Sequence, residues 1–285
     1  MHAVVYIHGI VGRRYGSHSG EYRALRDGLD RRGVDIPALE DSVSVEWGWP
    51  TPSAGSSALL ARAQSQLEVL RGDARQRDRW TRRLMAPLRD LVFYGWSDIA
   101  YYLDDGGKER IRGVIWTSIL RHFPTDEPVD LTLIGHSAGA LIGHDFLFFL
   151  FSGLRNERRH QYAPDCDWEA AAENWRIRRL VTLGSPFVPL VVRSADLVEE
   201  IAAGPGPWLD PAVIGFDQTA HDGRRPLWLN VWDRHDILSF PAAGVYRTDR
   251  VHDLYPDHSD RPTKAHSKYW KSKKVHRILA ENWDD

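Results

Sequence analysis

The chain reads LTLIGHSAGALIG from Leu131 to Gly143, where an apolar run meets a turn rich in glycine. The run Leu131–Ile134 is typical of a buried strand, and the apolar residues 141–150 fit a deeply buried helix. Between them Gly135–Gly139 form a G-x-S-x-G pattern. A serine in such a strand-to-helix turn is held in a strained backbone conformation, and its small neighbours let strand and helix approach closely. The stretch therefore predicts that Ser137 presents its hydroxyl at the carboxyl end of a strand.

Similar apolar runs recur along the chain and alternate with helical patterns. The further predicted strands are 3–7, 43–47, 179–183, 227–232 and 246–254, and the further predicted helices are 21–32, 57–70, 109–122 and 267–282. Ser19 is expected to cap the first of these helices, and Gly33 is expected to end it. Continuous apolar strands that alternate with helices indicate a parallel sheet with both faces covered. We therefore expect a three-layer α/β/α sandwich with a mostly parallel sheet.

Composition places the chain among globular proteins. It has 285 residues, of which 42% are hydrophobic and 27% charged, with a net charge of −2, so nothing favours nucleic acid or an anionic membrane as partner. The single cysteine, Cys166, allows no internal disulfide. No apolar stretch is long enough for a signal peptide or a membrane span. We expect one cytoplasmic domain over residues 1–285.

Two long connections, 50–94 and 186–225, are expected to be lid-like insertions, since long loops in compact domains often cover or form binding sites. Seven arginines between positions 71 and 89 alternate with aspartates, which favours a solvated, salt-bridged face over a surface for an anionic partner. Aromatic residues in or beside the insertions either line an apolar pocket or anchor loops to the core: Trp47, Trp49, Trp80, Trp96 and Trp208.

Together these motifs resemble those of the α/β-hydrolase superfamily, in particular its lipase- and esterase-like members. The resemblance rests on residues 5–9, 133–139 and 181–186, and it is extended by residues 230–238 and 265–270. The strand-to-helix turn Gly135–Gly139 around Ser137, which we call the elbow, is the most specific of these motifs. Since the first apolar strand begins at residue 3, the two strands that precede it in larger members are expected to be absent. The resemblance implies an α/β-hydrolase fold with a sheet shortened at its N-terminal edge.

An oxyanion hole is the next part that the resemblance implies. Backbone N–H donors must meet the negative oxygen that forms when a serine attacks an acyl group. In this fold one donor follows the nucleophile, here Ala138, and the other lies in the loop after an early strand, here Ile10. We expect His8 to brace that loop.

The acid and the base should follow Ser137 in that order along the chain. Asp233 and Asp236 are the two candidates for the acid. Asp236 precedes Ile-Leu-Ser-Phe-Pro, similar to the acid loop of lipases, and is favoured, whereas Asp233 could simply cap the strand's turn.

Four histidines lie downstream, at positions 252, 258, 266 and 276. His266 lies in a loop before the last helix and is the favoured base, and His258 is the alternative. As base it would take the proton of Ser137, while Asp236 would fix its tautomer and orientation.

The sequence thus predicts hydrolysis of a small-molecule or lipid ester through an acyl-serine, with no cofactor and no metal. Acyl transfer and cleavage of thioesters or amides use the same residues, and a non-catalytic binding protein is the alternative of another class. His252, Asp253, Asp257 and His258 could also be metal ligands, but a polar loop is the favoured interpretation.

Overall fold

The structure is a computed structural model, and it describes residues 1–9, 18–45, 47, 105–152, 160–191, 199 and 208–284. Several sequence predictions fall outside these residues. They are the helix 57–70, the insertion 50–94, the arginine run 71–89, the residues Ile10, Trp49, Trp80 and Trp96, and part of the insertion 186–225.

Within the described residues, six strands form a single sheet in which all neighbours are parallel, in the order β2-β1-β3-β4-β5-β6. The strands are β1 (His2–Ile7), β2 (Ser42–Val45), β3 (Val129–His136), β4 (Trp175–Leu183), β5 (Leu227–Val231) and β6 (Val251–Leu254). The chain passes from β1 to β2 and then returns to the other side of β1 for β3. In sheets of this kind ligands bind beyond the carboxyl ends of the strands, at the place where the order reverses. That place lies between β1 and β3.

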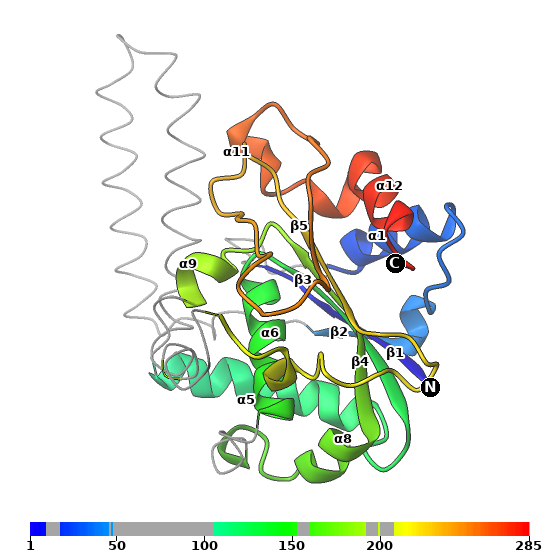
Figure 1. Ribbon diagram of the computed structural model, residues 1–285, viewed down its shortest axis with the longest axis vertical. Coiled ribbons are helices and arrows are strands. Elements are labelled where there is room, and N and C mark those ends of the chain that lie inside the picture. Colours follow the sequence, from blue (N-terminus) through cyan, green and yellow to red (C-terminus); the bar gives the residue numbers. More distant parts are fainter. Residues whose placement is uncertain are drawn as a thin grey trace, which may run out of the picture.

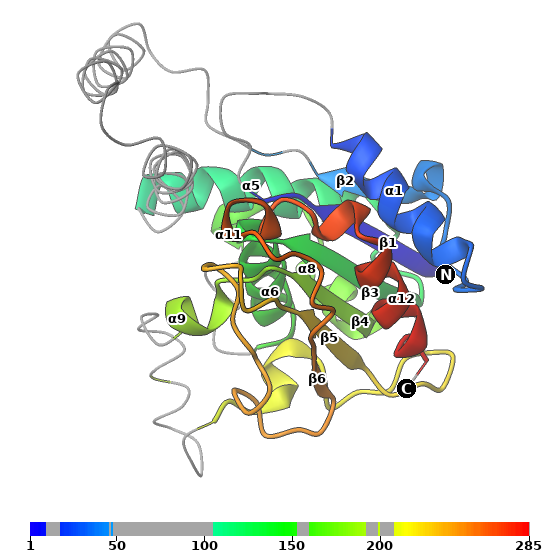
Figure 2. The same cartoon turned by 90° about the horizontal axis from the view of Figure 1, so that it is seen from above.

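Helices cover both faces of this sheet, as Figures 1 and 2 show. One face carries α1 (Ser19–Asp30) and α12 (Lys273–Glu281), and the other carries α5 (Asp105–His122), α6 (Ala138–Phe151) and α8 (Trp168–Asn174). The remaining described elements are short. They are the helices α9 (Phe187–Val191) and α11 (Pro262–Ala265) and the 3₁₀ turns η1 (Leu39–Asp41), η5 (Pro211–Ile214) and η6 (Tyr269–Lys271). The prediction of an α/β fold with a parallel sheet between two helical layers is confirmed.

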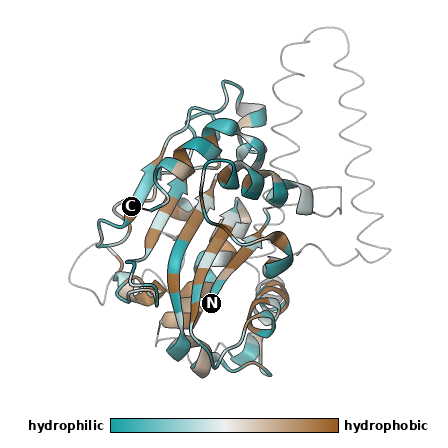
Figure 3. Cartoon of the chain, turned by 90° about the vertical axis from the view of Figure 1, so that its right-hand side faces the viewer, coloured by the Kyte–Doolittle hydropathy of each residue, from teal (hydrophilic) through white to brown (hydrophobic). Residues whose placement is uncertain are grey.

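β1 shows how the sequence builds the two cores. Successive side chains of a strand point to opposite faces. Val4 and Tyr6 pack in the cluster under α1 and α12, whereas Ala3, Val5 and Ile7 pack in the cluster under α5 and α6. All five residues are fully buried, and Figure 3 shows apolar residues concentrated along the strands. A strand that is buried on both faces must be apolar throughout, which is why its sequence shows no alternation.

The helix that follows Ser137 is as buried as its composition predicts. Every residue of α6 except Asp145 and Phe151 is buried. It nevertheless spans only Ala138–Phe151, and the described residues contain no helix that is both long and apolar enough to cross a membrane. Cys166 is a free, buried thiol.

Three predicted elements have different bounds in the structure. Ser19 is the first residue of α1 and not its cap, which is His18, and Gly33 lies in the turn that follows the helix with a positive φ of 80°. The predicted helix 267–282 is divided, because the Ser272 side chain accepts the N–H of Val275 and starts α12 afresh. The predicted strand 246–254 is strand only over β6, since Tyr246 instead bridges to Leu209.

Candidate active site

Ser137 lies in a strained turn at the carboxyl end of β3. Its φ of 53° and ψ of −125° are rare for a residue with a side chain, and such a conformation costs about 1–3 kcal/mol. The Ser137 N–H donates to the Leu183 carbonyl at 2.9 Å, which fixes the turn against β4. Because α6 begins at the next residue, the Ser137 side chain lies at the positive end of a helix.

Glycines around the turn are required by close backbone contacts. A Cβ at Gly139 would lie 2.3 Å from the carbonyl oxygens of both Ile7 and His8. A Cβ at Gly135 would lie 2.5 Å from Cα of Ala140, so the strand and helix could not approach as they do. The glycines of the G-x-S-x-G pattern therefore have a steric explanation in this structure.

Ser137, His266 and Asp236 form one continuous chain of hydrogen bonds. The distance from Ser137 Oγ to His266 Nε2 is 2.8 Å, and His266 Nδ1 lies 2.9 Å from Asp236 Oδ2 and 3.1 Å from Oδ1. A carboxylate can only accept, so the proton of the imidazole is on Nδ1 and Nε2 is free to accept the serine proton. The structure thus brings together the three residues that the sequence places 129 and 30 positions apart.

Asp236 is buried and held in its ionised form. Burial by itself would raise the pKa of this carboxyl group, but hydrogen bonds from His266, the Leu238 N–H and the Tyr269 hydroxyl lower it below its usual value. The Tyr269 hydroxyl donates to Oδ2 at 2.9 Å, and burial raises the pKa of that tyrosine. A Cβ at Gly184, whose φ is 59°, would lie 2.9 Å from the same oxygen. These contacts fix the carboxylate that orients His266.

Two further histidines hold the loop that carries His266. His258 Nε2 donates to the Ala265 carbonyl at 2.9 Å, and His136 Nε2 donates to the His266 carbonyl at 2.7 Å. Burial, and to a smaller extent the charge of the nearby His266, lowers the pKa of His136 to about 3, so His136 stays neutral.

The alternative acid and base, Asp233 and His258, form a second pair beside this loop. Both side chains are fully buried, and His258 Nδ1 lies 3.0 Å from Asp233 Oδ2. Asp233 also accepts the backbone N–H groups of His235 and His258, both at 2.9 Å. Its position suits the support of the loop, and the favoured pair, Asp236 and His266, is the one that reaches Ser137.

The loop after β1 packs directly against the nucleophile. A Cβ at Gly9 would lie 2.7 Å from Cβ of Ser137. His8 Nε2 accepts the Trp47 backbone N–H at 3.0 Å, and the Trp47 indole N–H donates to the His8 carbonyl at 2.9 Å. Burial lowers the pKa of His8 to about 4, so its neutral ring serves as a brace, as the sequence predicts. Ala138, one predicted oxyanion donor, is the first residue of α6, and Ile10 lies outside the described residues.

Ser137 has no exposed surface, while the His266 side chain is 14% exposed. The site therefore reaches solvent at the imidazole. Of the two described tryptophans beside the insertions, Trp47 anchors the loop after β1, and Trp208 lies under the guanidinium of Arg247.

The alternative metal set does not come together, because His252 and Asp253 lie within β6, whereas Asp257 and His258 follow it. The Asp253 carboxylate accepts hydrogen bonds from the Asn230 side chain and from the backbone N–H groups of Ala242 and Ala243, so its oxygens already have partners. In the part of the chain that the structure describes, the one group with suitable ligand atoms is instead Asp233, His235 and Asp257, within 4.8 Å of one another.

Sequence reasoning missed the supporting residues Tyr269 and His136. Tyr269 carries a core-like spacing in the terminal helix pattern, and only its hydroxyl distinguishes it from an apolar core residue. His136 occupies the variable position of the G-x-S-x-G pattern, which carries no signal by itself. No model of a known protein family matches this chain, and a search of curated proteins found none with a similar sequence.

Proposed function

We propose that this protein is a serine hydrolase of the α/β-hydrolase type that cleaves a carboxylic ester. The observation that carries the proposal is the unbroken chain from Ser137 through His266 to Asp236, built on a strained turn. Distances of 2.8 and 2.9 Å are those expected of a nucleophile, its base and the group that orients the base. The side chains of Tyr269, His136 and His258 hold this arrangement.

In the first half of the reaction, Ser137 Oγ attacks the carbonyl carbon of the ester while His266 Nε2 takes its proton. The negative oxygen of the tetrahedral intermediate would accept hydrogen bonds from the backbone N–H groups of Ala138 and Ile10. His266 then donates the proton to the departing alkoxide, which leaves as an alcohol, and an acyl-serine remains. Asp236 stays ionised and stabilises the imidazolium in both halves of the reaction.

In the second half, a water molecule attacks the acyl-serine and gives its proton to His266 Nε2. The tetrahedral intermediate collapses, Ser137 Oγ takes the proton back from His266, and a carboxylic acid is released. No step requires a redox group. Since Ser137 is fully buried, the proposal requires that its hydroxyl become accessible when a substrate binds.

The proposal is tested with a fluorophosphonate probe, which reacts only with an activated serine. The wild-type protein should be labelled at Ser137, and Ser137→Ala should not be labelled. Ser239→Ala is a matched control, because Ser239 is also a buried serine in the same region but bonds to Asp233 and Asp236 backbone oxygens. A folded wild-type protein that takes no label would favour a non-catalytic binding role.

Ester hydrolysis should accompany the labelling. A panel of p-nitrophenyl esters of increasing acyl length gives the preferred chain, and added alcohols or amines as acceptors separate hydrolysis from acyl transfer. Release of free acid in the presence of acceptors is the expected result, and transfer of the acyl group to an acceptor would identify a transferase.

A further inference from the structure

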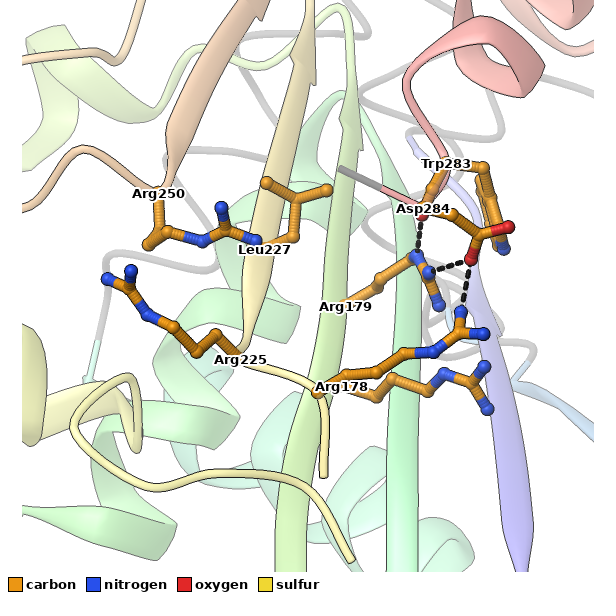
Figure 4. A pocket seen from close by; sticks show the side chains of 8 residues that line it. Arg178, Arg179, Arg225, Leu227, Arg250, Trp283 and Asp284 are labelled. Carbon is orange, nitrogen blue, oxygen red and sulfur yellow. Dashed lines mark hydrogen bonds and ion pairs between the residues drawn. The ribbon is translucent and has the colours of Figure 1, made fainter. Parts of the chain in front are cut away.

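A cavity of about 380 Å³ lies at the opposite end of the sheet from Ser137. It is located where β5 begins with Leu227 and just before β6, whereas Ser137 follows the last residue of β3. We call it the arginine pocket, and its lining residues are Arg178, Arg179, Arg224, Arg225, Leu227, Arg250, Trp283 and Asp284, as Figure 4 shows. This volume falls within the range of small-molecule sites, about 300–1,000 Å³.

An irregularity in β4 supplies two of these arginines. Leu131 pairs with Ile177 and Thr132 with Arg179, so Arg178 is an extra residue in the strand. Successive residues of a regular strand point to opposite faces, yet Arg178 and Arg179 line the same cavity. A bulge of this kind re-aims a side chain, and such bulges are common beside functional sites.

Among the described residues, four of the pocket's arginines share three carboxylates. Arg178 pairs with Asp222 at 3.3 Å, Arg225 with Asp249 at 3.3 Å, and Arg179 with Asp284 at 2.9 Å. Arg224 contacts Asp284 and Asp222 as well, so these three carboxylates serve four guanidinium groups. Arg250 Nε donates to the Pro226 carbonyl at 3.2 Å, which holds this fifth side chain at the rim of the cavity.

Two buried N–H groups of the pocket have no acceptor. Nε of Arg178 and Nη1 of Arg179 are both inaccessible and without a hydrogen-bond partner. Arg179 is only 2% exposed, and burial together with the charge of Arg178 lowers its pKa to about 10. Leaving a buried donor unpaired costs about 1–3 kcal/mol. Because these two atoms are inaccessible, an acceptor in the cavity reaches them only when the arginine side chains move.

We propose that the arginine pocket binds a small anion that carries at least two phosphate charges. Guanidinium groups present planar pairs of N–H donors that match phosphate oxygens, and five of them around one cavity suit a polyanion better than a single carboxylate. The Asp284 carboxylate, which contacts Arg179 and Arg224, occupies the position of one anionic oxygen. This site is independent of the proposed hydrolase activity.

Isothermal titration of the full chain with pyrophosphate, at constant ionic strength, tests the proposal. Arg225→Gln and Arg250→Gln should each weaken binding about tenfold, the effect of one lost charged hydrogen bond. Asp284→Asn should strengthen binding about threefold, because it removes a competing carboxylate. Arg121→Gln on α5 is the control, since Arg121 is similarly exposed and also paired with an aspartate, Asp165.

A second arm distinguishes a free ligand from a lipid headgroup. Phosphatidylcholine vesicles with and without phosphatidylinositol bisphosphate are sedimented with the wild type and the same variants. The proposal is supported if either probe binds most tightly to Asp284→Asn, less tightly to the wild type and least tightly to Arg225→Gln. Binding of pyrophosphate would indicate a free ligand, and binding of the vesicles would indicate a lipid headgroup. The absence of binding to both probes, or binding that Arg121→Gln weakens as much as Arg225→Gln does, would overturn the proposal.

Discussion

The two ends of the sheet use polar groups in opposite ways. At the carboxyl end, Ser137, His266 and Asp236 each have their partners within the chain, and the side chains of His136 and His258 hold the backbone around them. At the other end, five arginines line one cavity, and among the described residues four of them share three carboxylates. The hydrogen-bonded chain at the first end can act on a substrate without rearranging its own charges, whereas the second end offers guanidinium groups to an anionic ligand. The following substitutions change residues at one end of the sheet, and the function of the other end should be unaffected.

His266→Ala should have the largest effect on activity. It removes the base from Ser137, and we expect kcat/KM for an ester to fall about a thousandfold or more. The pyrophosphate affinity should not change, since the arginine pocket lies at the other end of the sheet. Full activity of this variant would contradict the assignment of the base.

Gly139→Ala should have the largest effect on folding. The new Cβ would lie 2.3 Å from two carbonyl oxygens, and overpacking against a rigid backbone costs about 3 kcal/mol. Gly20→Ala is the matched control, because Gly20 is also the second residue of a helix and nothing lies within 4 Å of its Cβ position. Urea unfolding should show a loss for Gly139→Ala and a gain of up to about 1 kcal/mol for Gly20→Ala. Equal stabilities would mean that the turn is not as tight as described.

Acid should lower the free energy of unfolding through buried histidines, whereas the arginines keep their charge. Burial lowers the pKa of both His136 and His144 to about 3, below the value of 6.5 in the unfolded chain. Between these values the unfolded state binds more protons, so stability is full above pH 6.5 and is lost as the pH falls. At pH 5 each histidine should have cost about 2 kcal/mol of unfolding free energy.

His144→Phe isolates one of these two contributions. His144 Nε2 lies 2.5 Å from the Tyr246 hydroxyl, and its ring packs against Phe187 and Trp228. Urea unfolding of the variant between pH 7 and 5 should show a pH dependence that is smaller by about 2 kcal/mol. An unchanged pH dependence would show that His144 is not held neutral.

His258→Ala should lower kcat about tenfold, because the Ala265 carbonyl would lose its donor and the loop of His266 would be less well held. KM should change little, and the pH profile should keep the wild-type midpoint, since His266 remains the base. His258→Gln, which retains a donor, should recover part of the rate. A loss as large as that of His266→Ala would make His258 the base instead.

Arg225→Gln should have the smallest effect on stability. Its partner Asp249 is 78% exposed, and exposed ion pairs contribute less than about 1 kcal/mol. Thermal unfolding should therefore be nearly unchanged while pyrophosphate binding weakens. A large loss of stability would show that the arginine pocket is structural.

The parts of the fold and of the candidate site that could be predicted from the sequence are those that leave a local pattern in it. β1, β3 and β5 were predictable because strands buried on both faces must be apolar throughout, and the glycines of the elbow report a backbone contact. Chain order left two candidates for the acid and four for the base, and local context favoured Asp236 and His266. That these two lie together at Ser137 depends on how their loops fold, which no local pattern contains. The His258–Asp233 pair and the arginine pocket unite residues far apart in sequence, so no local signal marks them.

The most direct test of the central claim is a rapid-mixing measurement with p-nitrophenyl acetate. The wild-type protein should release a burst of about one p-nitrophenol per chain, and acid quenching should trap an acetyl group on the peptide that contains Ser137. His266→Ala should abolish the burst. A wild-type protein that hydrolyses the ester without acetylating Ser137, or a Ser137→Ala variant that hydrolyses it equally fast, would contradict the account.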